Sequence, residues 1–177
     1  MKYSCQLRLD PNTAHRFLVL SEGNRTVTWE GEWQPYPGHP ERFEDWWQIL
    51  CRDGLTGRCY WEVWKTGRVD IGVAYRGIRR RGKTEDGRLG WNKNSWVLTC
   101  YDGSFSAQHN NIRTDTCEPP NCSRVAVYLD WPAGSLSFYS VSSDTLIHLH
   151  TFTCTFTQPL YPAFGFGFNA SVTLPPG

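Results

Sequence analysis

Seven cysteines and five histidines are the residues of this sequence with the greatest scope for chemistry. The cysteines stand at positions 5, 51, 59, 100, 117, 122 and 154, and only Cys117 and Cys122 lie close together. That pair suits a disulfide or half of a zinc site, but no second pair or well-spaced histidine completes four ligands. An odd, scattered set in a chain of 177 residues favours free thiols in a reducing compartment. We therefore expect a cytoplasmic protein without a bound metal.

No catalytic template fits the remaining reactive residues. The chain lacks a Gly-x-Ser-x-Gly nucleophile elbow, and His148 and His150 are two ligands without a third. Residues 77–84 have the spacing Gly-x-x-x-x-Gly-Lys-Thr, but no helical periodicity follows them, and a phosphate-binding loop must open a helix. No pair of carboxylates stands out as an acid–base couple. The sequence therefore predicts a protein that is not an enzyme, with no catalytic residues and no cofactor.

The charges of the chain are nearly balanced. It carries 18 basic and 17 acidic residues, a formal net charge of +1 at pH 7, which argues against nonspecific binding to nucleic acid or to an anionic membrane. An RNA contact through Arg79–Arg81 is the alternative, although Glu85 and Asp86 stand close enough to answer those charges. No apolar run approaches the roughly 20 residues of a membrane span, and the first residues lack the apolar stretch of a signal peptide.

Aromatic residues in loops are the clearest sign of a function. The chain has nine tryptophans, and Trp and Tyr supply a large contact area at a small entropic cost. Residues 30–48 are aromatic and broken by proline, and residues 76–88 are rich in arginine and glycine. Trp33, Tyr36, Tyr101 and Phe105 are the candidates for binding a partner, whereas we expect Trp46, Trp47, Trp61 and Trp96 to be structural.

Period-two alternation of apolar residues indicates the elements that carry these loops. The repeating faces are Cys59, Trp61 and Val63; Val69, Ile71, Val73 and Tyr75; Trp96, Leu98 and Cys100; and Val125, Val127, Leu129 and Trp131. The dipeptide Asp102-Gly103 is typical of a tight hairpin, because both residue types tolerate a positive φ. Strands that recur about every 8–12 residues predict an all-β chain, folded as a two-layer antiparallel β-sandwich with little helix.

Five sequence blocks, taken in order, resemble the PRY-SPRY family. They are Leu9–Ala14, Gly57–Val63 with its Trp-Glu-Val strand, Leu89–Trp96, Leu129–Tyr139 with its Leu-Asp-Trp and Leu-Ser-Phe-Tyr strings, and Pro159–Phe164. The resemblance covers about residues 5–170. It implies a single domain over residues 1–177, with PRY at about 5–50 and SPRY at about 51–174, folded as a concanavalin-like sandwich of the jelly-roll type.

The resemblance also implies a function. Members are noncatalytic recognition modules of tripartite-motif ubiquitin ligases, butyrophilins, fish NOD-like receptors and stonefish-type toxins. We therefore expect the ligand-sensing C-terminal domain of an innate-immune ligase or receptor, with a host or pathogen protein as ligand and any oligomerisation through other domains. The alternatives are a domain of a secreted pore-forming fish toxin and an RNA-contacting module.

The family's ligands meet loops at one end of the sandwich, which by position are residues 30–48, 64–68, 76–88 and 99–113. In the family member that grips antibody Fc, the pocket falls by position on Thr99 and Tyr101, on Arg76, and on Phe168-Asn169. That ligase has Trp and an acidic residue where this chain has Thr99 and Arg76, so we expect a different ligand. The predicted partner-binding residues are Trp33, Tyr36, Arg76, Arg79, Thr99, Tyr101, Phe105, Phe168 and Asn169.

Overall fold

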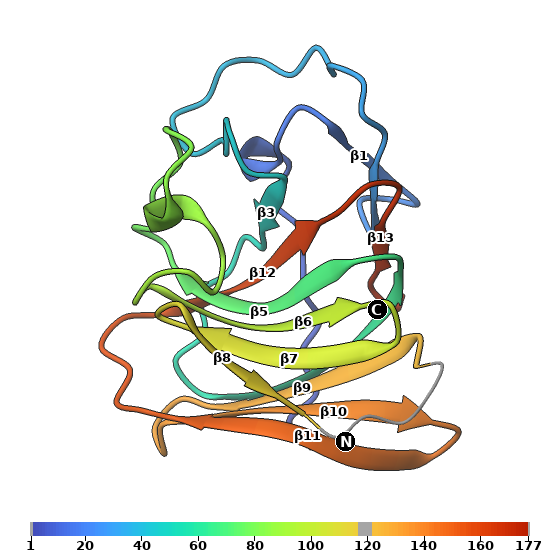
Figure 1. Cartoon of the computed structure of the whole chain (residues 1–177), viewed down its shortest axis with the longest axis vertical. Helices are drawn as coiled ribbons and strands as arrows, with labels where there is room; N and C mark the ends of the chain where they lie inside the picture. The colour runs from blue at the N-terminus through green and yellow to red at the C-terminus, as the bar shows by residue number, and fades with distance from the viewer. Residues whose placement is uncertain (1, 117–121, 177) are drawn as a thin grey trace.

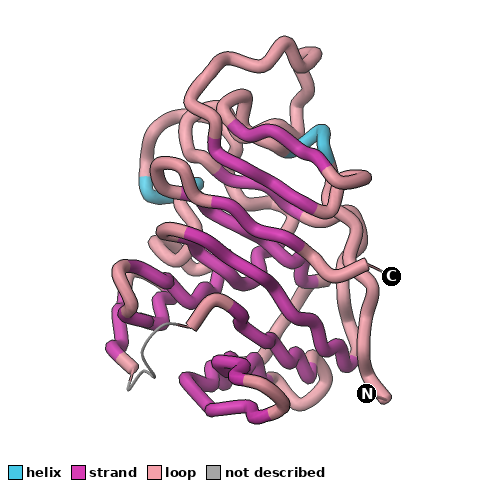
Figure 2. Tube along the Cα trace, turned by 90° about the vertical axis from the view of Figure 1, so that its right-hand side faces the viewer, coloured by secondary structure: helices cyan, strands magenta, loops and turns pink. Residues whose placement is uncertain are grey.

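A computed structural model describes residues 2–116 and 122–176 of the chain. Within these residues, thirteen strands and two single-turn 3-10 helices follow one another. Figures 1 and 2 show how they are arranged. The elements are η1 (Pro11–Thr13), β1 (Leu18–Ser21), β2 (Thr26–Trp29), β3 (Gln48–Leu50), β4 (Arg58–Thr66), β5 (Val69–Tyr75), η2 (Glu85–Gly87), β6 (Ser95–Tyr101), β7 (Ser104–His109), β8 (Ile112–Asp115), β9 (Arg124–Asp130), β10 (Ser135–Ser142), β11 (Thr145–Thr153), β12 (Leu160–Phe166) and β13 (Ser171–Thr173).

The strands form two antiparallel sheets. The seven-stranded sheet has the order β1-β2-β13-β4-β9-β10-β11, and the six-stranded sheet has the order β3-β12-β5-β6-β7-β8. Both sheets mix early and late parts of the chain: β13 lies between β2 and β4, and β12 pairs with β3. The prediction of an all-β, two-layer antiparallel sandwich is confirmed.

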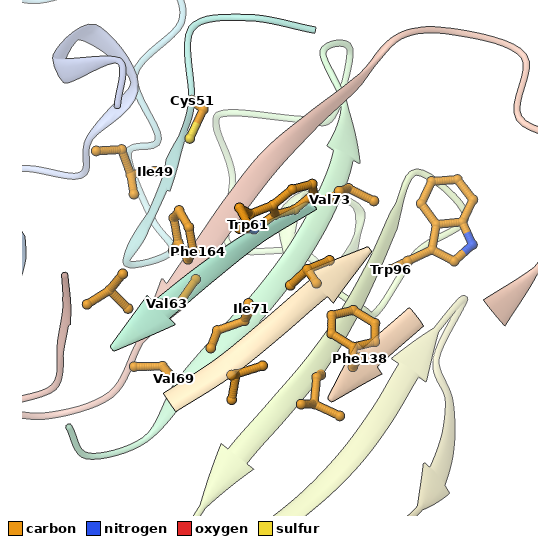
Figure 3. Packing of buried hydrophobic residues seen from close by; sticks show 14 of the residues in the cluster. Ile49, Cys51, Trp61, Val63, Val69, Ile71, Val73, Trp96, Phe138 and Phe164 are labelled. Atoms are coloured by element: carbon orange, nitrogen blue, oxygen red, sulfur yellow. The ribbon is translucent and has the colours of Figure 1, made fainter. Parts of the chain in front are cut away.

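The larger of two buried clusters lies between the two sheets and is built by the alternating residues. Trp61 and Val63 of β4 are buried, as are Ile71 and Val73 of β5, and Phe138 of β10 reaches the same cluster. Figure 3 shows these side chains gathered between the strands. Burial of each such side chain contributes roughly 1.5–3 kcal/mol to the stability of the fold. Because neighbouring residues of a strand point to opposite faces, the buried residues also determine which residues point outward.

The β6–β7 turn has the geometry that its sequence predicts. Asp102 and Gly103 have φ values of 49° and 78°, and Cys100 pairs with Phe105 across the hairpin. The turn therefore sets the register that leaves Tyr101 at the exposed end of β6.

Cys5 and Cys59 form a disulfide, so the expectation of free thiols is wrong for this pair. The first residues run beside β4: the backbone N–H of Cys5 donates to the Tyr60 carbonyl at 2.9 Å, and the Cα atoms of the two cysteines are 5.5 Å apart. This pairing is 54 positions apart in sequence, so cysteine spacing does not reveal it. Cys51, Cys100, Cys122 and Cys154 carry free thiols, and burial raises the pKa of the first two. Cys117, and with it the question of a Cys117–Cys122 pair, lies outside the described residues.

Candidate functional site

Five parts of the chain surround one cavity, which we call the aromatic cavity. Its volume is about 540 Å³. It lies between the segment before β3, the β4–β5 turn, the segment between β5 and β6, the β6–β7 turn and the β12–β13 loop. The lining residues are Asp45, Trp46, Trp47, Gln48, Arg68, Asp70, Lys83, Arg88, Tyr101, Gly165, Phe166, Gly167 and Phe168.

Two exposed aromatic side chains flank this cavity. Phe168 is 73% exposed, and its ring meets Trp29 and Trp47 edge to face, with ring centroids 5.1 and 5.2 Å apart. Tyr101 is 58% exposed, and the Arg68 guanidinium lies 5.3 Å from its ring centroid. The backing rings hold Phe168 in place while most of its surface stays in water. Such rings are suited to contact a partner without a large ordering cost.

A carboxylate lies on the floor of the cavity. Asp70 stands between the inward-facing Val69 and Ile71 on β5, so its side chain points to the outer face of the six-stranded sheet. The Thr99 hydroxyl, directly opposite on β6, donates to Asp70 Oδ1 at 2.7 Å. On the other side lies Gly165, where a methyl group would come within 2.7 Å of Asp70 Oδ2. Glycine at this position therefore leaves room for the carboxylate.

Burial raises the pKa of Asp70, and the Thr99 hydrogen bond and the charges of Arg68 and Arg88 oppose that rise. The burial effect is the largest of these contributions, so the carboxylate holds its negative charge less firmly than an aspartate in water. A partner that brings hydrogen-bond donors or alters the local charge would change its ionisation.

Arg88 occupies a second wall and is held by aromatic rings. Its guanidinium lies 4.1 Å from the Trp91 ring centroid and 5.0 Å from that of Trp46. Gln48 fixes the backbone on both sides of Arg88: its Nε2 donates to the Gly87 carbonyl at 2.8 Å, and its Oε1 accepts from the Leu89 N–H at 2.9 Å. These contacts therefore hold the Arg88 guanidinium in a defined position at the cavity.

The structure brings together some of the residues predicted for partner binding. Tyr101 and Phe168 line the cavity, Thr99 holds its carboxylate, and Asn169 follows Phe168 at an exposed left-handed position with a φ of 57°. The role of these residues in binding stays a prediction.

Arg76 does not join this group, which corrects its expected position. It follows the far end of β5, six residues or roughly 20 Å of strand from Asp70. There its Nη2 lies 3.4 Å from an Asp10 carboxylate oxygen, and its Nε lies 3.5 Å from Glu41. The carboxylate on the floor of the cavity is Asp70, which was not among the predicted residues. Its signal was a lone acidic residue at the outward position of an apolar strand.

Phe105 is also corrected. It is 3% exposed and packs in the core, because it stands opposite the inward-facing Cys100 in the β6–β7 hairpin. Its side chain is therefore not available to a partner.

Two further predicted residues lie on the long loop before β3, away from the cavity lining. Trp33 is 70% exposed, and the Arg16 guanidinium lies 4.8 Å from its ring centroid. Tyr36 is half-buried, and its hydroxyl donates to the Leu18 carbonyl at 2.6 Å. Tyr36 thus ties the loop to β1, whereas Trp33 remains open to contact.

The arginine run is largely engaged with its own chain. Arg79 Nε donates to the Arg81 carbonyl at 2.7 Å, and Arg81 Nε lies 3.5 Å from Glu44. Arg80 pairs with Glu41 at 3.1 Å and has a side chain only 7% exposed. Two of the three cations in the run are therefore paired with carboxylates, whereas Arg79 keeps an unpaired charge among the described residues.

Neither a metal cluster nor a membrane-crossing helix is found in the described part of the chain. Among residues 2–116 and 122–176, no three His, Cys, Asp or Glu side chains gather so as to hold a metal ion. The helices in the same residues are too short and too polar to cross a membrane.

The fold is that of a known class of domain. The family profile of the SPRY-associated domain, PRY, matches residues 7–55, and the profile of the SPRY domain matches residues 58–177. The chain belongs to the PRY-SPRY family.

Relatives of two kinds are similar to this chain. It is 44% identical over 170 residues to neoverrucotoxin subunit alpha of Synanceia verrucosa, covering 94% of this chain and 24% of that protein. It is 39% identical over 175 residues to tripartite motif-containing protein 14 of Mus musculus, covering 92% of this chain and 38% of that protein. The chain thus spans well under half the length of these relatives.

Two solved structures share the fold closely. The structure of stonustoxin matches with a TM-score of 0.91 and 42% identity, over 98% of this chain and 27% of that one. The PSpry domain of TRIM65 matches with a TM-score of 0.89 and 30% identity, over 99% of this chain and 92% of that one. The second match corresponds to nearly a whole domain in each protein.

Proposed function

We propose that this domain is a noncatalytic protein-recognition module that binds its partner at the aromatic cavity. The observation that carries the proposal is the placement of Tyr101 and Phe168, two largely exposed rings from separate parts of the chain, around a cavity with a partly buried carboxylate on its floor. Aromatic anchors around a pocket are typical of the centres of protein interfaces. The similarity to domains of tripartite-motif proteins supports the same role.

The scaffold suits recognition because the loops that carry these rings are short and anchored. Tyr101 ends β6 beside the β6–β7 turn, and Phe168 lies in the short loop between β12 and β13, where it rests on Trp29 and Trp47. A preformed site loses little conformational entropy on binding. Most of the contact energy that the rings provide therefore contributes to the binding affinity.

We extend the proposal to the parent protein. The similarity to tripartite-motif proteins supports a ligand-sensing domain of a cytoplasmic innate-immune protein, a ligase or a receptor, with a host or pathogen protein as ligand. Any self-association of the parent would then use other parts of that protein.

The variant Tyr101→Ala/Phe168→Ala tests the proposal. We expect partner affinity to fall by about 30-fold or more, because both anchors are removed, while the free energy of unfolding changes by less than about 1 kcal/mol. Quantitative affinity capture from extracts of the source tissue, followed by titration of the captured protein, measures the first quantity. Urea unfolding measures the second.

The matched control is Leu146→Ala/Ile147→Ala, which removes two side chains on β11 that are 46% and 40% exposed. These residues do not line the aromatic cavity. The control should retain the partner at full affinity. A captured partner that binds the cavity variant as tightly as the natural domain would contradict the proposal.

A second candidate function is a recognition domain within a secreted cytolytic-toxin subunit. The specific observation in its favour is the 44% identity to toxin subunits of Synanceia, together with the match to the stonustoxin structure. Immunodetection of the natural protein distinguishes the two candidates: a cytosolic fraction favours the first, and a venom or secreted fraction favours the second.

A further inference from the structure

A second, polar recess adjoins the aromatic cavity on the outer face of the six-stranded sheet. We call it the arginine recess. Its volume is about 280 Å³, and it shares Arg68, Asp70 and Arg88 with the aromatic cavity. Thr99, Gln108 and Arg113 are among its other lining residues. The two spaces therefore lie side by side and share part of their walls, one mainly aromatic and the other cationic.

Strand register explains why this recess is open. Asp70, Thr99 and Ser106 stand side by side on β5, β6 and β7, and all three are small enough to leave space above the sheet. Three arginines reach the space from different elements: Arg68 from the β4–β5 turn, Arg88 from the segment after η2, and Arg113 from β8.

The charge of the lining is positive. Arg68, Arg88 and Arg113 contribute three positive charges and Asp70 one negative charge, a sum of +2, whereas the whole chain carries only +1. Burial also raises the pKa of Asp70, which lowers its power to neutralise the arginines. The recess is thus a local concentration of positive charge on a nearly neutral protein.

The arginines keep unused capacity for a carboxylate. Aromatic rings hold Arg68 and Arg88, and no carboxylate among residues 2–116 and 122–176 lies within ion-pair distance of either one. Arg113 pairs with Asp115 at 3.0 Å, but both side chains are well exposed, at 65% and 78%. An exposed pair of this kind is weak, so an incoming carboxylate can replace it at little cost.

Resting on the recognition function proposed above, we propose that the partner presents an acidic peptide segment to this site. An Asp or Glu side chain enters the arginine recess, and a neighbouring apolar side chain enters the aromatic cavity between Tyr101 and Phe168. The planar guanidinium groups suit a carboxylate because they can donate two parallel hydrogen bonds.

The same observations favour a peptide over RNA. A bound RNA strand needs a basic track that follows several phosphates, and the arginines here converge on one recess beside an apolar cavity. A short segment with one acidic and one apolar side chain satisfies both parts together.

The test begins with phage-displayed random 12-residue peptides selected on the immobilised domain. We expect enriched peptides to carry Asp or Glu next to Trp, Phe or Leu. For a synthetic selected peptide, replacement of that Asp by Asn should weaken binding by about tenfold or more, as measured by calorimetry. This change is made in the peptide, so it tests the inference without altering the domain.

The variant Arg68→Gln/Arg113→Gln should bind the same peptide with an affinity that is lower by a similar factor. Arg8→Gln is the matched control, because Arg8 is an exposed arginine paired with Asp53 and does not line either space. Circular dichroism confirms the fold of each variant. Unchanged affinity in the folded double variant would overturn the inference.

Other outcomes separate this inference from the recognition function. Basic or uncharged peptides that still require Tyr101 and Phe168 would overturn the acidic ligand and keep the function. Selected peptides that bind the Tyr101→Ala/Phe168→Ala variant at full affinity would overturn both. The absence of any enriched peptide, or stronger binding of oligouridylate RNA than of the selected peptide, would also overturn the acidic-peptide inference.

Discussion

His15 is a neutral imidazole enclosed at the start of the sandwich. It is 6% exposed, its Nδ1 accepts the backbone N–H of Phe17 at 3.0 Å, and its ring meets the Phe17 ring edge to face at 5.2 Å. Burial lowers the pKa of His15 to about 4, and the Glu44 backbone and the Asp45 charge oppose this only in part. Between about pH 4 and pH 6.5, His15 is therefore neutral in the folded protein and protonated in the unfolded chain.

This histidine makes stability depend on pH in a defined direction. Its pKa is about 6.5 in the unfolded chain and about 4 when folded, so the unfolded state binds more protons between these values. Stability is full above about pH 6.5 and falls as the pH decreases toward 4. At pH 4.5 the loss from His15 should be about 2–3 kcal/mol. Urea unfolding at pH 7.5 and 4.5 measures it.

The variant His15→Asn isolates this contribution, since an amide oxygen can accept the same N–H and does not titrate. The variant should lose about 2–3 kcal/mol less than the natural protein between the two pH values. Asp70, whose pKa is raised, contributes with the opposite sign in both proteins and cancels in the comparison. An equal loss in both proteins would show that His15 is not responsible.

At the scale of single residues, sequence pattern assigns the faces of strands better than it assigns a site. Alternation around Val69 and Ile71 implies an outward Asp70, but the loops that enclose this carboxylate come from distant parts of the chain. The burial of Phe105 was within reach of the sequence, because the Asp102-Gly103 turn places it opposite the core residue Cys100.

A buried arginine helps to hold the long segment before β3, residues 30–47, in place. Figure 1 shows this segment arching over the top of the molecule in light blue. Arg42 is 2% exposed, and its Nη1 donates to the carbonyls of Pro11 and Ala14 at 3.0 and 2.7 Å. Its Nε and Nη2 donate to the Pro37 carbonyl at 3.3 and 3.1 Å. The clamp ties the loop to η1.

Arg42→Ala should lower the free energy of unfolding by about 2–4 kcal/mol, because three carbonyl groups lose their donors and a cavity forms. Arg42→Lys should recover only part of this loss, since an ammonium group lacks the planar fork. The segment leads into Trp46 and Trp47, so we also expect Arg42→Ala to weaken binding at the aromatic cavity. Denaturant unfolding and peptide titration measure the two effects.

Arg8→Ala is the control for the loss of a guanidinium group. Arg8 and Asp53 form a surface pair with side chains 63% and 56% exposed, which is worth at most about 1 kcal/mol. If Arg42→Ala were no more destabilising than Arg8→Ala, the buried clamp would not be what holds the segment.

At the scale of elements, sequence predicted strands well and the proline-rich loop poorly. The inward faces of β4, β5, β6 and β9 follow simple alternation, which packing between two sheets enforces. The loop has no such period, because hydrogen bonds from Arg42 and Tyr36 to distant carbonyls decide its path. Of the two binding candidates on this loop, Trp33 is exposed, whereas Tyr36 is half-buried and bonded to the Leu18 carbonyl.

At the scale of the whole molecule, the Cys5–Cys59 disulfide ties the first residues to β4. The bond closes a loop of 54 residues, which in the chain-entropy account stabilises the fold by up to about 4 kcal/mol. We expect Cys5→Ser, or reduction of the natural protein, to lower the free energy of unfolding by a few kcal/mol at most. Non-reducing peptide mapping by mass spectrometry identifies the bond.

Cys154→Ser is the control, because Cys154 carries a free, half-buried thiol. The free energy of unfolding of this variant should differ from that of the natural protein by less than about 1 kcal/mol. Reducing agent should lower the stability of both proteins by the same amount. Recovery of Cys5 and Cys59 only as separate thiols would contradict the bond and would support the reducing compartment that the cysteine pattern predicts.

The insertion of β13 between β2 and β4 has a consequence for how the protein is made. Residues 26–28 leave the ribosome long before residues 171–173, their neighbours in the sheet. Until then the β1–β2 hairpin stands alone, and an isolated hairpin is marginally stable at best. The seven-stranded sheet is completed only after its last-made strand has emerged. The edges of β2 and β4 that β13 will cover stay unpaired throughout that time, and unpaired edges are prone to pair with strands of other chains.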